Sequence, residues 1–256
     1  MKQLIAGIVE NKRISDRFYK MRVRSSYLGR AARPGQFVEV KCSDAPEFIL
    51  RRPLGCHRIL KGGIELLYEV VGKGTEMLSK RKAGEGLDII GPLGNGFTAS
   101  TKAAILVAGG VGVAPLFALA EDFTQTGRKV SVVIGAKKRS HVLCERELKD
   151  LGCAVKTATE DGSKGYKGLA TELLQDMLAT SREVRVAIYA CGPVGMLKEV
   201  ARIAEAKKIP CQVSLEERMA CGVGVCLGCP VKVKTGEGYR MVCKDGPVFN
   251  AEEIAW

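Results

Sequence analysis

Three cysteines close together near the end of the chain, followed by a fourth, constrain this sequence more than any other feature. Cys221, Cys226 and Cys229 have the spacing C-x4-C-x2-C, and Cys243 follows after a gap. This spacing is one that holds a [2Fe-2S] cluster, in which each iron takes two thiolates. Three glycines within the loop allow it to fold tightly and bring backbone N–H groups close to the sulfur atoms. The sequence therefore predicts that these four cysteines ligate a [2Fe-2S] cluster.

A structural zinc site is the main alternative for these cysteines. Such sites use CxxC pairs arranged as a tetrahedron, and only Cys226 and Cys229 form such a pair here. A disulfide framework is disfavoured because no pattern typical of a secretory signal is present, so a reducing compartment, the cytoplasm, is the expected location. The six cysteines outside the motif are expected to be small buried apolar residues. They are Cys42, Cys56, Cys144, Cys153, Cys191 and Cys211.

The length and charge of the chain limit its class. With 256 residues it is long enough for two ordinary domains and a small third unit. The net charge of +12 is compatible with nucleic-acid binding, but aromatic residues make up only 5% and no nucleic-acid module is recognisable. Phosphate-bearing cofactors or an acidic partner surface explain the basic excess equally well. We therefore expect no nucleic-acid partner.

One uncharged run, from Ala103 to Ala120, approaches the length of a membrane span. Because glycines and Pro115 interrupt it, the run is predicted to be strand, turn and helix. No membrane span is expected.

The first hundred residues alternate short apolar stretches with turns rich in glycine, proline and charge. This pattern predicts a small antiparallel barrel of six strands with one intervening helix. The helix is expected to have Thr75 as its N-cap and to run to about Lys82. The six strands are expected at Leu4–Val9, Phe18–Val23, Gln36–Val40, Leu54–Leu60, Ile64–Val71 and Leu87–Ile90.

A pyrophosphate is a candidate ligand of this barrel. Arg52 is expected where an extended stretch ends, and Gly74-Thr75 opens the helix. A guanidinium offers a fork of hydrogen bonds and a helix start offers free N–H groups, so the two can grip a pyrophosphate from both sides. This suits a flavin dinucleotide. Taken singly, Arg52 is equally compatible with a surface salt bridge, and Gly74-Thr75 with a simple turn.

After Pro92 the pattern changes to strands alternating with helices, which indicates a parallel sheet covered by helices. Ligands of such sheets bind at the carboxyl ends of the strands. The strands are expected at Ala103–Val107, Val130–Ile134, Ala154–Thr157, Val184–Tyr189 and Cys211–Val213, with helices at 116–123 and 194–206 among others.

Two strand ends of this sheet carry candidate nicotinamide-binding residues. The first strand runs into Gly109-Gly110-Val111-Gly112, and Pro115 lies in the first turn of the next helix, as a dinucleotide phosphate site requires. The fourth strand ends in Cys191-Gly192-Pro193, near the same crevice. Lys137-Lys138-Arg139 is a candidate for a 2′-phosphate and so for NADP. Each has a simpler alternative. The glycine turn can be merely a tight turn, Cys191 a buried packing thiol, and the basic run a solvated loop.

In this order, the pieces resemble the ferredoxin-NADP reductase superfamily over residues 1 to about 215. Over nearly the whole chain they are similar to the electron-transfer subunits of NAD-linked dihydroorotate dehydrogenase. The stretches that carry the resemblance are Arg52-Pro53-Leu54 with Gly74-Thr75, Gly91 to Phe97, Gly109 to Pro115, Cys191-Gly192-Pro193, Met219 to Cys226 and Cys243 to Val248.

The resemblance implies a fold and a set of site residues. The expected fold is an antiparallel FAD-binding β-barrel domain at 1–98, an NAD-binding α/β domain at 99–215 and a small [2Fe-2S] domain at 216–256. The family's flavin motif usually ends in serine or threonine, so Gly55 leaves out a hydroxyl contact to the flavin. The residues implied to contact FAD are Arg52, Pro53, Leu54, Gly55, Leu67, Tyr68, Glu69, Gly74 and Thr75, and the glycine turn and Cys191-Gly192-Pro193 are implied to bind the nicotinamide nucleotide.

A nicotinamide exchanges a hydride, whereas an iron-sulfur cluster passes one electron at a time. A flavin converts between the two, so a cluster and a nicotinamide site in one chain point to FAD. The resemblance implies that an FMN-containing catalytic subunit oxidises dihydroorotate, in a heterotetramer with two copies of each chain. This chain then carries the electrons to NAD+ during de novo pyrimidine (UMP) biosynthesis.

No residue of this chain is expected to act on the carbon substrate, and His57 and His141 are expected to be structural or at the surface. Two alternatives stay open from the sequence. One is an NAD(P)H reductase or diaphorase subunit linked to ferredoxin or hydrogenase. The other is a zinc-stabilised module that binds nucleic acid.

Overall fold

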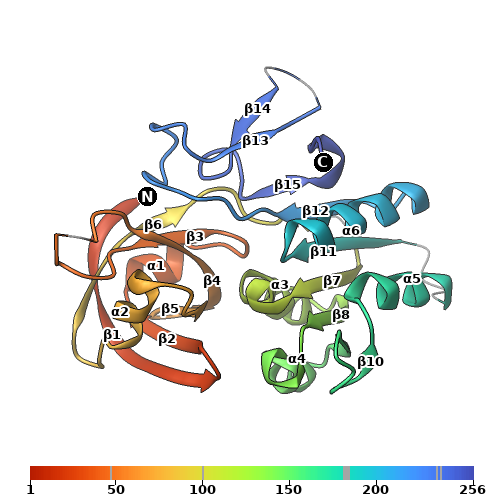
Figure 1. Cartoon of the computed structure of the whole chain (residues 1–256), viewed down its shortest axis with the longest axis horizontal. Helices are drawn as coiled ribbons and strands as arrows, with labels where there is room; N and C mark the ends of the chain where they lie inside the picture. The colour runs from red at the N-terminus through yellow and green to blue at the C-terminus, as the bar shows by residue number, and fades with distance from the viewer. Residues whose placement is uncertain (47, 100, 181–184, 235, 237) are drawn as a thin grey trace.

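The computed structural model describes residues 1–46, 48–99, 101–180, 185–234, 236 and 238–256. Figure 1 shows a barrel beside a parallel sheet with helices on its faces, and a small C-terminal part that lies across both. The predicted fold class, a β-barrel followed by an α/β unit, is confirmed.

The N-terminal barrel closes through six antiparallel strands in the order β1-β2-β5-β4-β3-β6. Alternate residues of each strand point inward and form an apolar core that includes Val38, Ile64 and Leu87. Two short helices accompany the strands. The elements are β1 (Lys2–Ser15), β2 (Phe18–Arg24), α1 (Ser26–Ala31), β3 (Phe37–Val40), β4 (Arg52–Leu60), β5 (Gly63–Glu69), α2 (Lys73–Ser79) and β6 (Gly86–Leu93).

Strand β1 continues to Ser15, beyond the predicted end at Val9, and the barrel differs from the prediction in three further respects. Helix α1 was not predicted, because its six residues are too few to show a helical period. Thr75 is the third residue of α2 and not its N-cap, which is Gly72, and the helix ends at Ser79. Arg52 begins strand β4 instead of ending an extended stretch. This last change keeps Arg52 at a barrel rim, where it faces α2.

The second unit is a seven-stranded sheet in the order β10-β9-β8-β7-β11-β12-β15, parallel except for its last strand. Val184, the predicted start of the fourth strand, lies outside the described residues, and β11 starts at Val186. The elements are β7 (Ala103–Gly109), α3 (Val113–Gln125), β8 (Lys129–Ala136), α4 (Glu145–Asp150), β9 (Ala154–Thr159), β10 (Tyr166–Lys167), α5 (Ala170–Thr180), β11 (Val186–Cys191), α6 (Val194–Lys207) and β12 (Cys211–Ser214).

The uncharged run from Ala103 to Ala120 forms β7, a 3-10 turn at Gly110–Gly112 and the start of α3. Every residue of β7 is buried, because helices cover both faces of a parallel sheet. Among the described residues, no helix is both long and apolar enough to cross a membrane.

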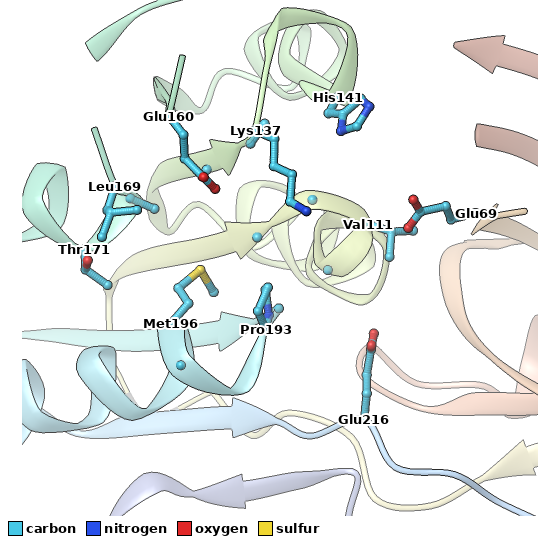
Figure 2. Close-up of a pocket in the computed structure, with 18 of the residues that line it drawn as sticks. Glu69, Val111, Lys137, His141, Glu160, Leu169, Thr171, Pro193, Met196 and Glu216 are labelled. Atoms are coloured by element: carbon cyan, nitrogen blue, oxygen red, sulfur yellow. The ribbon is translucent and has the colours of Figure 1, made fainter. Parts of the chain in front are cut away.

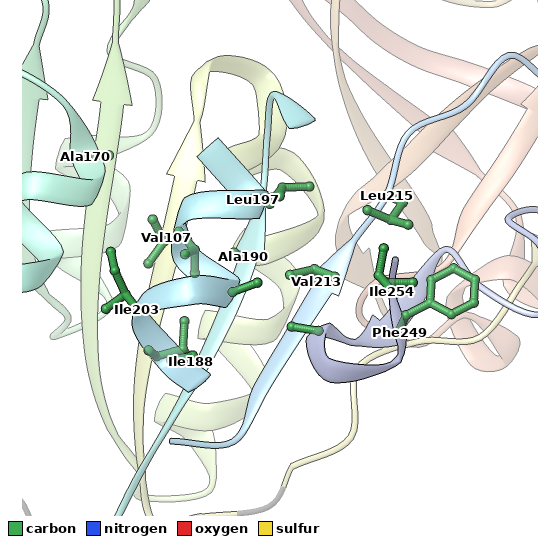
Figure 3. Packing of buried hydrophobic residues seen from close by; sticks show 14 of the residues in the cluster. Val107, Ala170, Ile188, Ala190, Leu197, Ile203, Val213, Leu215, Phe249 and Ile254 are labelled. Atoms are coloured by element: carbon green, nitrogen blue, oxygen red, sulfur yellow. The ribbon is translucent and has the colours of Figure 1, made fainter. Parts of the chain in front are cut away.

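The C-terminal part shares a core with the parallel sheet. Its strands are β13 (Pro230–Lys232), β14 (Tyr239–Met241) and β15 (Val248–Asn250), and β15 pairs antiparallel with β12. Figure 3 shows Phe249 and Ile254 packed against Val213 and Leu215, in the same cluster that fills the space under α6. The cysteine loop is thereby fixed to the sheet by apolar contacts.

A buried polar contact joins the barrel to α3. His57 is 0% exposed, and its Nδ1 lies 3.2 Å from the carbonyl oxygen of Ala114. Burial lowers the pKa of His57 to about 3, so the ring is neutral and structural, in line with the prediction. Beside it, Arg58 Nε donates to Glu121 Oε1 at 2.9 Å. These contacts fix the barrel relative to the helix that follows the glycine turn.

Candidate functional site

A cavity of about 330 Å³, which we call the flavin-side cavity, lies between the barrel, the start of α3 and the segment after β12. It brings together residues from all three predicted units. Eight of the nine residues implied to contact FAD line it, namely Arg52, Pro53, Leu54, Gly55, Leu67, Tyr68, Glu69 and Thr75.

Arg52 stands against the start of α2, as the sequence predicts. A Cβ atom on Gly74 would lie 2.8 Å from Arg52 Nε, so only glycine leaves room for the guanidinium there. Gly74 itself does not line the cavity, but it leaves space for the side chain of Arg52, which does. Thr75 Oγ1 accepts from the backbone N–H of Val71 at 3.0 Å and holds the loop before α2. The guanidinium and the helix start therefore face one end of the same cavity.

Gly55 packs beside Pro115 in the lining of this cavity. A Cβ atom on residue 55 would lie 3.6 Å from Pro115 Cβ, which is ordinary van der Waals contact. The site therefore has room for a small side chain at this position. Ser214, buried beside Cys191 at the end of β12, lines the same cavity and supplies a different hydroxyl.

Several lining residues were missed by the sequence analysis. Most come from the start of β3 with the turn before it, and from the end of β12 with the segment that follows it. Val111 lies in the glycine turn, and Pro247 directly precedes β15. A strand end directly before the cysteine motif is the signal that points to this segment. The missed residues include Gly35, Phe37, Val111, Ser214, Glu216, Glu217, Met219 and Pro247.

A second cavity, of about 530 Å³, lies at the carboxyl ends of the parallel strands, and we call it the nicotinamide crevice. Gly109, Gly110 and Gly112 line it, together with Gly192 and Pro193. A Cβ atom on Gly109 would lie 2.6 Å from Pro193 Cδ, so the two predicted strand ends meet in space. Pro115 and Cys191 were predicted near this crevice but line the flavin-side cavity instead.

The two cavities meet at Glu69, Val111 and Glu216, which line both. Figure 2 shows these three side chains gathered at one end of the crevice. Arg17 Nε pairs with Glu69 Oε1 at 2.5 Å. The Glu216 side chain is exposed to the space where the cavities join, and partial desolvation by the surrounding walls raises its pKa.

The far end of the crevice carries Glu160 after β9 and Lys137 after β8, and both side chains point into it in Figure 2. Lys138 turns away and pairs with Asp16 Oδ2 at 3.1 Å. His141 lines the crevice, and its Nε2 lies 3.3 Å from the same carboxylate. Of the predicted basic run, Lys137 reaches the crevice, whereas Lys138 pairs with the barrel.

The four predicted ligands form two pairs of thiols. Cys221 and Cys226 are hydrogen-bonded neighbours, with the N–H of Cys226 3.5 Å from Cys221 Sγ. Cys229 and Cys243 form the second pair, with the N–H of Cys243 3.4 Å from Cys229 Sγ. Two thiols for each of two irons is the ligand arrangement of a [2Fe-2S] cluster.

The surroundings of these thiols also suit a cluster. Burial opposes ionisation of Cys221, but N–H donors from Cys226 and Val223 outweigh it and lower its pKa to about 6. Burial and the neighbouring Cys229 raise the pKa of Cys243 to about 12. Thiols of this kind lose their protons and become thiolates when a metal ion binds their sulfur atoms. In the described part of the chain, no three His, Cys, Asp or Glu side chains are grouped closely enough to hold one metal ion.

The other six cysteines are free, and all except the partly buried Cys211 are buried, as predicted. Burial raises the pKa of Cys42 and Cys153 to about 11 and of Cys56 to about 12, which keeps these thiols protonated.

Comparison with known proteins agrees with this geometry. A family model described as the iron-sulfur cluster binding domain of dihydroorotate dehydrogenase B matches residues 216–255. A model described as an oxidoreductase NAD-binding domain matches residues 106–202.

The fold is shared with solved reductases. The NADH-dependent reduced ferredoxin-NADP oxidoreductase, an electron-bifurcating flavin enzyme, is 30% identical and aligns with a TM-score of 0.88 over 99% of this chain and 90% of that one. The ferredoxin reductase in carbazole 1,9a-dioxygenase shares the fold at 19% identity, with a TM-score of 0.67 over 82% of this chain and 67% of that one.

Closer sequence relatives have one name in common: dihydroorotate dehydrogenase B (NAD(+)), electron transfer subunit. The protein from Desulforamulus reducens is 39% identical over 93% of this chain and 92% of its own length. The one from Caldanaerobacter subterraneus subsp. tengcongensis is 40% identical over 97% of both. Since the match extends over nearly the full length of this chain and of each relative, this chain belongs to the family of electron transfer subunits of NAD(+)-dependent dihydroorotate dehydrogenase B.

Proposed function

We propose that this chain carries electrons from a separate FMN-containing catalytic subunit, which oxidises dihydroorotate, to NAD+ in de novo pyrimidine (UMP) biosynthesis. One observation carries the proposal: the thiol pairs, the flavin-side cavity and the nicotinamide crevice adjoin one another. Met219 lines the flavin-side cavity two residues before Cys221, and Glu69, Val111 and Glu216 join that cavity to the crevice. The ten free cysteines support action in the reducing cytoplasm.

Each cofactor has residues that suit it. Arg52 to Gly55, Leu67 to Glu69 and Gly74-Thr75 would hold FAD, with the Arg52 guanidinium and the start of α2 against its pyrophosphate. Gly109 to Gly112 and Gly192-Pro193 would hold the nicotinamide nucleotide. Cys221, Cys226, Cys229 and Cys243 would hold the cluster. When bound, FAD links the one-electron chemistry of a [2Fe-2S] cluster to hydride transfer.

The chain's own residues position the partners of this transfer. The barrel and α3 are fixed to each other by His57 and Arg58, which sets the separation of the two cavities. Cys191 and Pro115 line the flavin-side cavity, and Gly192, which follows Cys191, lines the crevice. Glu69, paired with Arg17, and Glu216 supply carboxyl oxygens at the junction, where they can accept hydrogen bonds from a bound nucleotide.

The direct test separates this chain from its partner. The chain, purified without air, is expected to contain FAD, iron and acid-labile sulfide, and NADH should bleach its flavin. It should oxidise no dihydroorotate until the catalytic subunit is added. Turnover of dihydroorotate by this chain alone would contradict the division of labour, and an iron-free, colourless protein would contradict the function.

A ferredoxin-linked NAD(P)H reductase is the second candidate, because the solved oxidoreductase with a TM-score of 0.88 is of that kind. The two functions differ in the electron donor. Co-purification from the native source with an FMN-containing dihydroorotate-oxidising subunit supports the first, and reduction by ferredoxin without that subunit supports the second.

The exposed side of the cysteine loop is the proposed docking surface for the catalytic subunit. Val225 is 79% exposed and Leu227 66% exposed, on either side of the exposed Cys226. An electron crosses between proteins most readily where a cluster lies near the surface, and apolar side chains there are typical of an interface. We propose that two such chains join two catalytic subunits.

Leu227→Asp should weaken this assembly by roughly a hundredfold, because the interface would have to desolvate a charge. Leu227 has a positive φ of 55°, a backbone that aspartate tolerates well, so the fold should be kept. Ile5→Asp, at a residue 69% exposed on the barrel, is the matched control and should leave assembly unchanged. Size-exclusion chromatography of the mixed subunits measures both.

Glu160 should favour NAD+ over NADP+, because its carboxylate faces the crevice and would repel a 2′-phosphate. We expect Glu160→Gln to raise kcat/KM for NADP(H), relative to that for NAD(H), by roughly tenfold. Lys138→Gln is the control, since Lys138 pairs with Asp16. An unchanged ratio in Glu160→Gln would assign the preference to another residue.

A further inference from the structure

Glu39 is the most unusual buried side chain among the described residues. It is 0% exposed, and neither of its carboxyl oxygens has a hydrogen-bond partner in the structure. Burial of a carboxyl group without a partner costs free energy, so native proteins seldom keep one without a use.

Its position explains what it faces. On β3, Val38 and Val40 point into the barrel core, so Glu39 points outward between them. The cysteine loop covers it there: a Cβ atom on Gly222 would lie 2.6 Å from Glu39 Cγ and 2.8 Å from Oε1. Gly222 has a φ of 68° and directly follows Cys221. The carboxyl group is therefore held against the loop that carries the proposed cluster.

The nearby arginines do not neutralise this carboxyl by direct contact. Arg51 Nη2 pairs with Asp88 Oδ2 at 2.7 Å, and Arg52 Nη1 donates to the carbonyl oxygen of Leu50 at 2.6 Å. Burial raises the pKa of Glu39 to about 7, with Arg51 and Arg52 opposing the shift and Cys221 adding to it. These three are the charged or ionisable groups that act on it most strongly.

We propose that the Glu39 carboxylate lowers the reduction potential of the cluster site, a role that rests on the proposed function. A reduced cluster carries one more negative charge than an oxidised one. A carboxylate held nearby in a medium of low dielectric constant disfavours that extra charge. The barrel thus contributes a potential-setting group to a centre whose ligands all come from the C-terminal part.

The test measures the potential and not turnover. In the intact chain loaded with its cofactors, Glu39→Gln should raise the ratio of reduced to oxidised cluster at a fixed solution potential by about tenfold. This equals about 59 mV for a one-electron couple. The titration is followed by electron paramagnetic resonance at about pH 9, which favours the ionised form of a carboxyl group.

Two further variants make the result decisive. Glu39→Met, which also removes the charge but keeps the volume, should produce the same shift and should stabilise the fold. Glu65→Gln is the matched control, because Glu65 is a partly buried barrel carboxyl on β5, away from the cysteine loop. The reduction potential of the cluster should be unchanged in this variant. An unchanged potential in both Glu39 variants, with iron and sulfide retained, would overturn the inference and leave the proposed function intact. Loss of the cluster from both would show that Glu39 only supports the loop.

Discussion

Replacing Cys229 with serine should stop electron transfer from the catalytic subunit to NAD+ while leaving the flavin chemistry intact. Cys229 is buried and pairs with Cys243, so no neighbouring thiol is free to replace it. Removing even an indirect support of a metal site costs 10- to 100-fold, so loss of a direct ligand should reduce dihydroorotate-to-NAD+ turnover by at least about a hundredfold. The measurement is turnover of the complete enzyme, together with its iron and sulfide content.

A second activity serves as the internal control. Oxidation of NADH by an artificial acceptor that takes electrons from flavin needs only the two cavities, so it should be unchanged in Cys229→Ser. Cys211→Ser alters a partly buried cysteine outside the motif and should keep iron, sulfide and both activities. If Cys229→Ser kept its iron and full turnover, the four-cysteine assignment would be wrong.

The second large effect is expected at Arg52. Arg52→Ala should lower the affinity for FAD by roughly a hundredfold, because two charge-assisted hydrogen bonds to a pyrophosphate together contribute about 3 kcal/mol. The helix start alone would remain on the other side. Flavin retained after gel filtration, and fluorescence titration of the flavin-free protein, measure the change.

Two neighbouring variants sharpen this result. Gly74→Ala should weaken FAD binding as well, because its Cβ atom would lie 2.8 Å from Arg52 Nε and would displace the guanidinium. Arg51→Ala removes an arginine one position earlier that pairs with Asp88, so FAD affinity should stay the same. Equal losses in Arg51→Ala and Arg52→Ala would point to barrel destabilisation and away from a pyrophosphate contact.

The adjoining sites explain why one chain carries three units. The flavin-side cavity is closed by residues of the barrel, of α3 and of the segment before the cysteine loop, so no unit alone can form it. Because β15 completes the sheet that supports the crevice, the cysteine loop and the nicotinamide site are held by one continuous core. Electron transfer depends steeply on separation, and this shared core fixes the separation.

The sequence by itself determined the local chemistry of this protein. The cysteine spacing, the glycine turn after a buried strand and the change from short strands to strand-helix alternation depend on neighbouring residues, which a linear pattern records. They predicted the barrel, the parallel sheet and the loops that carry the sites. The helix α1 was missed and Thr75 was misplaced by three residues, because such short elements depend on packing more than on period.

Only the tertiary structure decided which of these residues meet. Pro115 and Cys191 line the flavin-side cavity, and Lys138 pairs with Asp16. Glu39 lies against Gly222, which is far away in the chain. Contacts of this kind arise when separate elements bury apolar surface against each other, and no spacing within one segment encodes the partner. The predicted ligands of the cluster can therefore be found in the sequence, whereas the group proposed to tune it and the residues that join the cavities appear only in the folded chain.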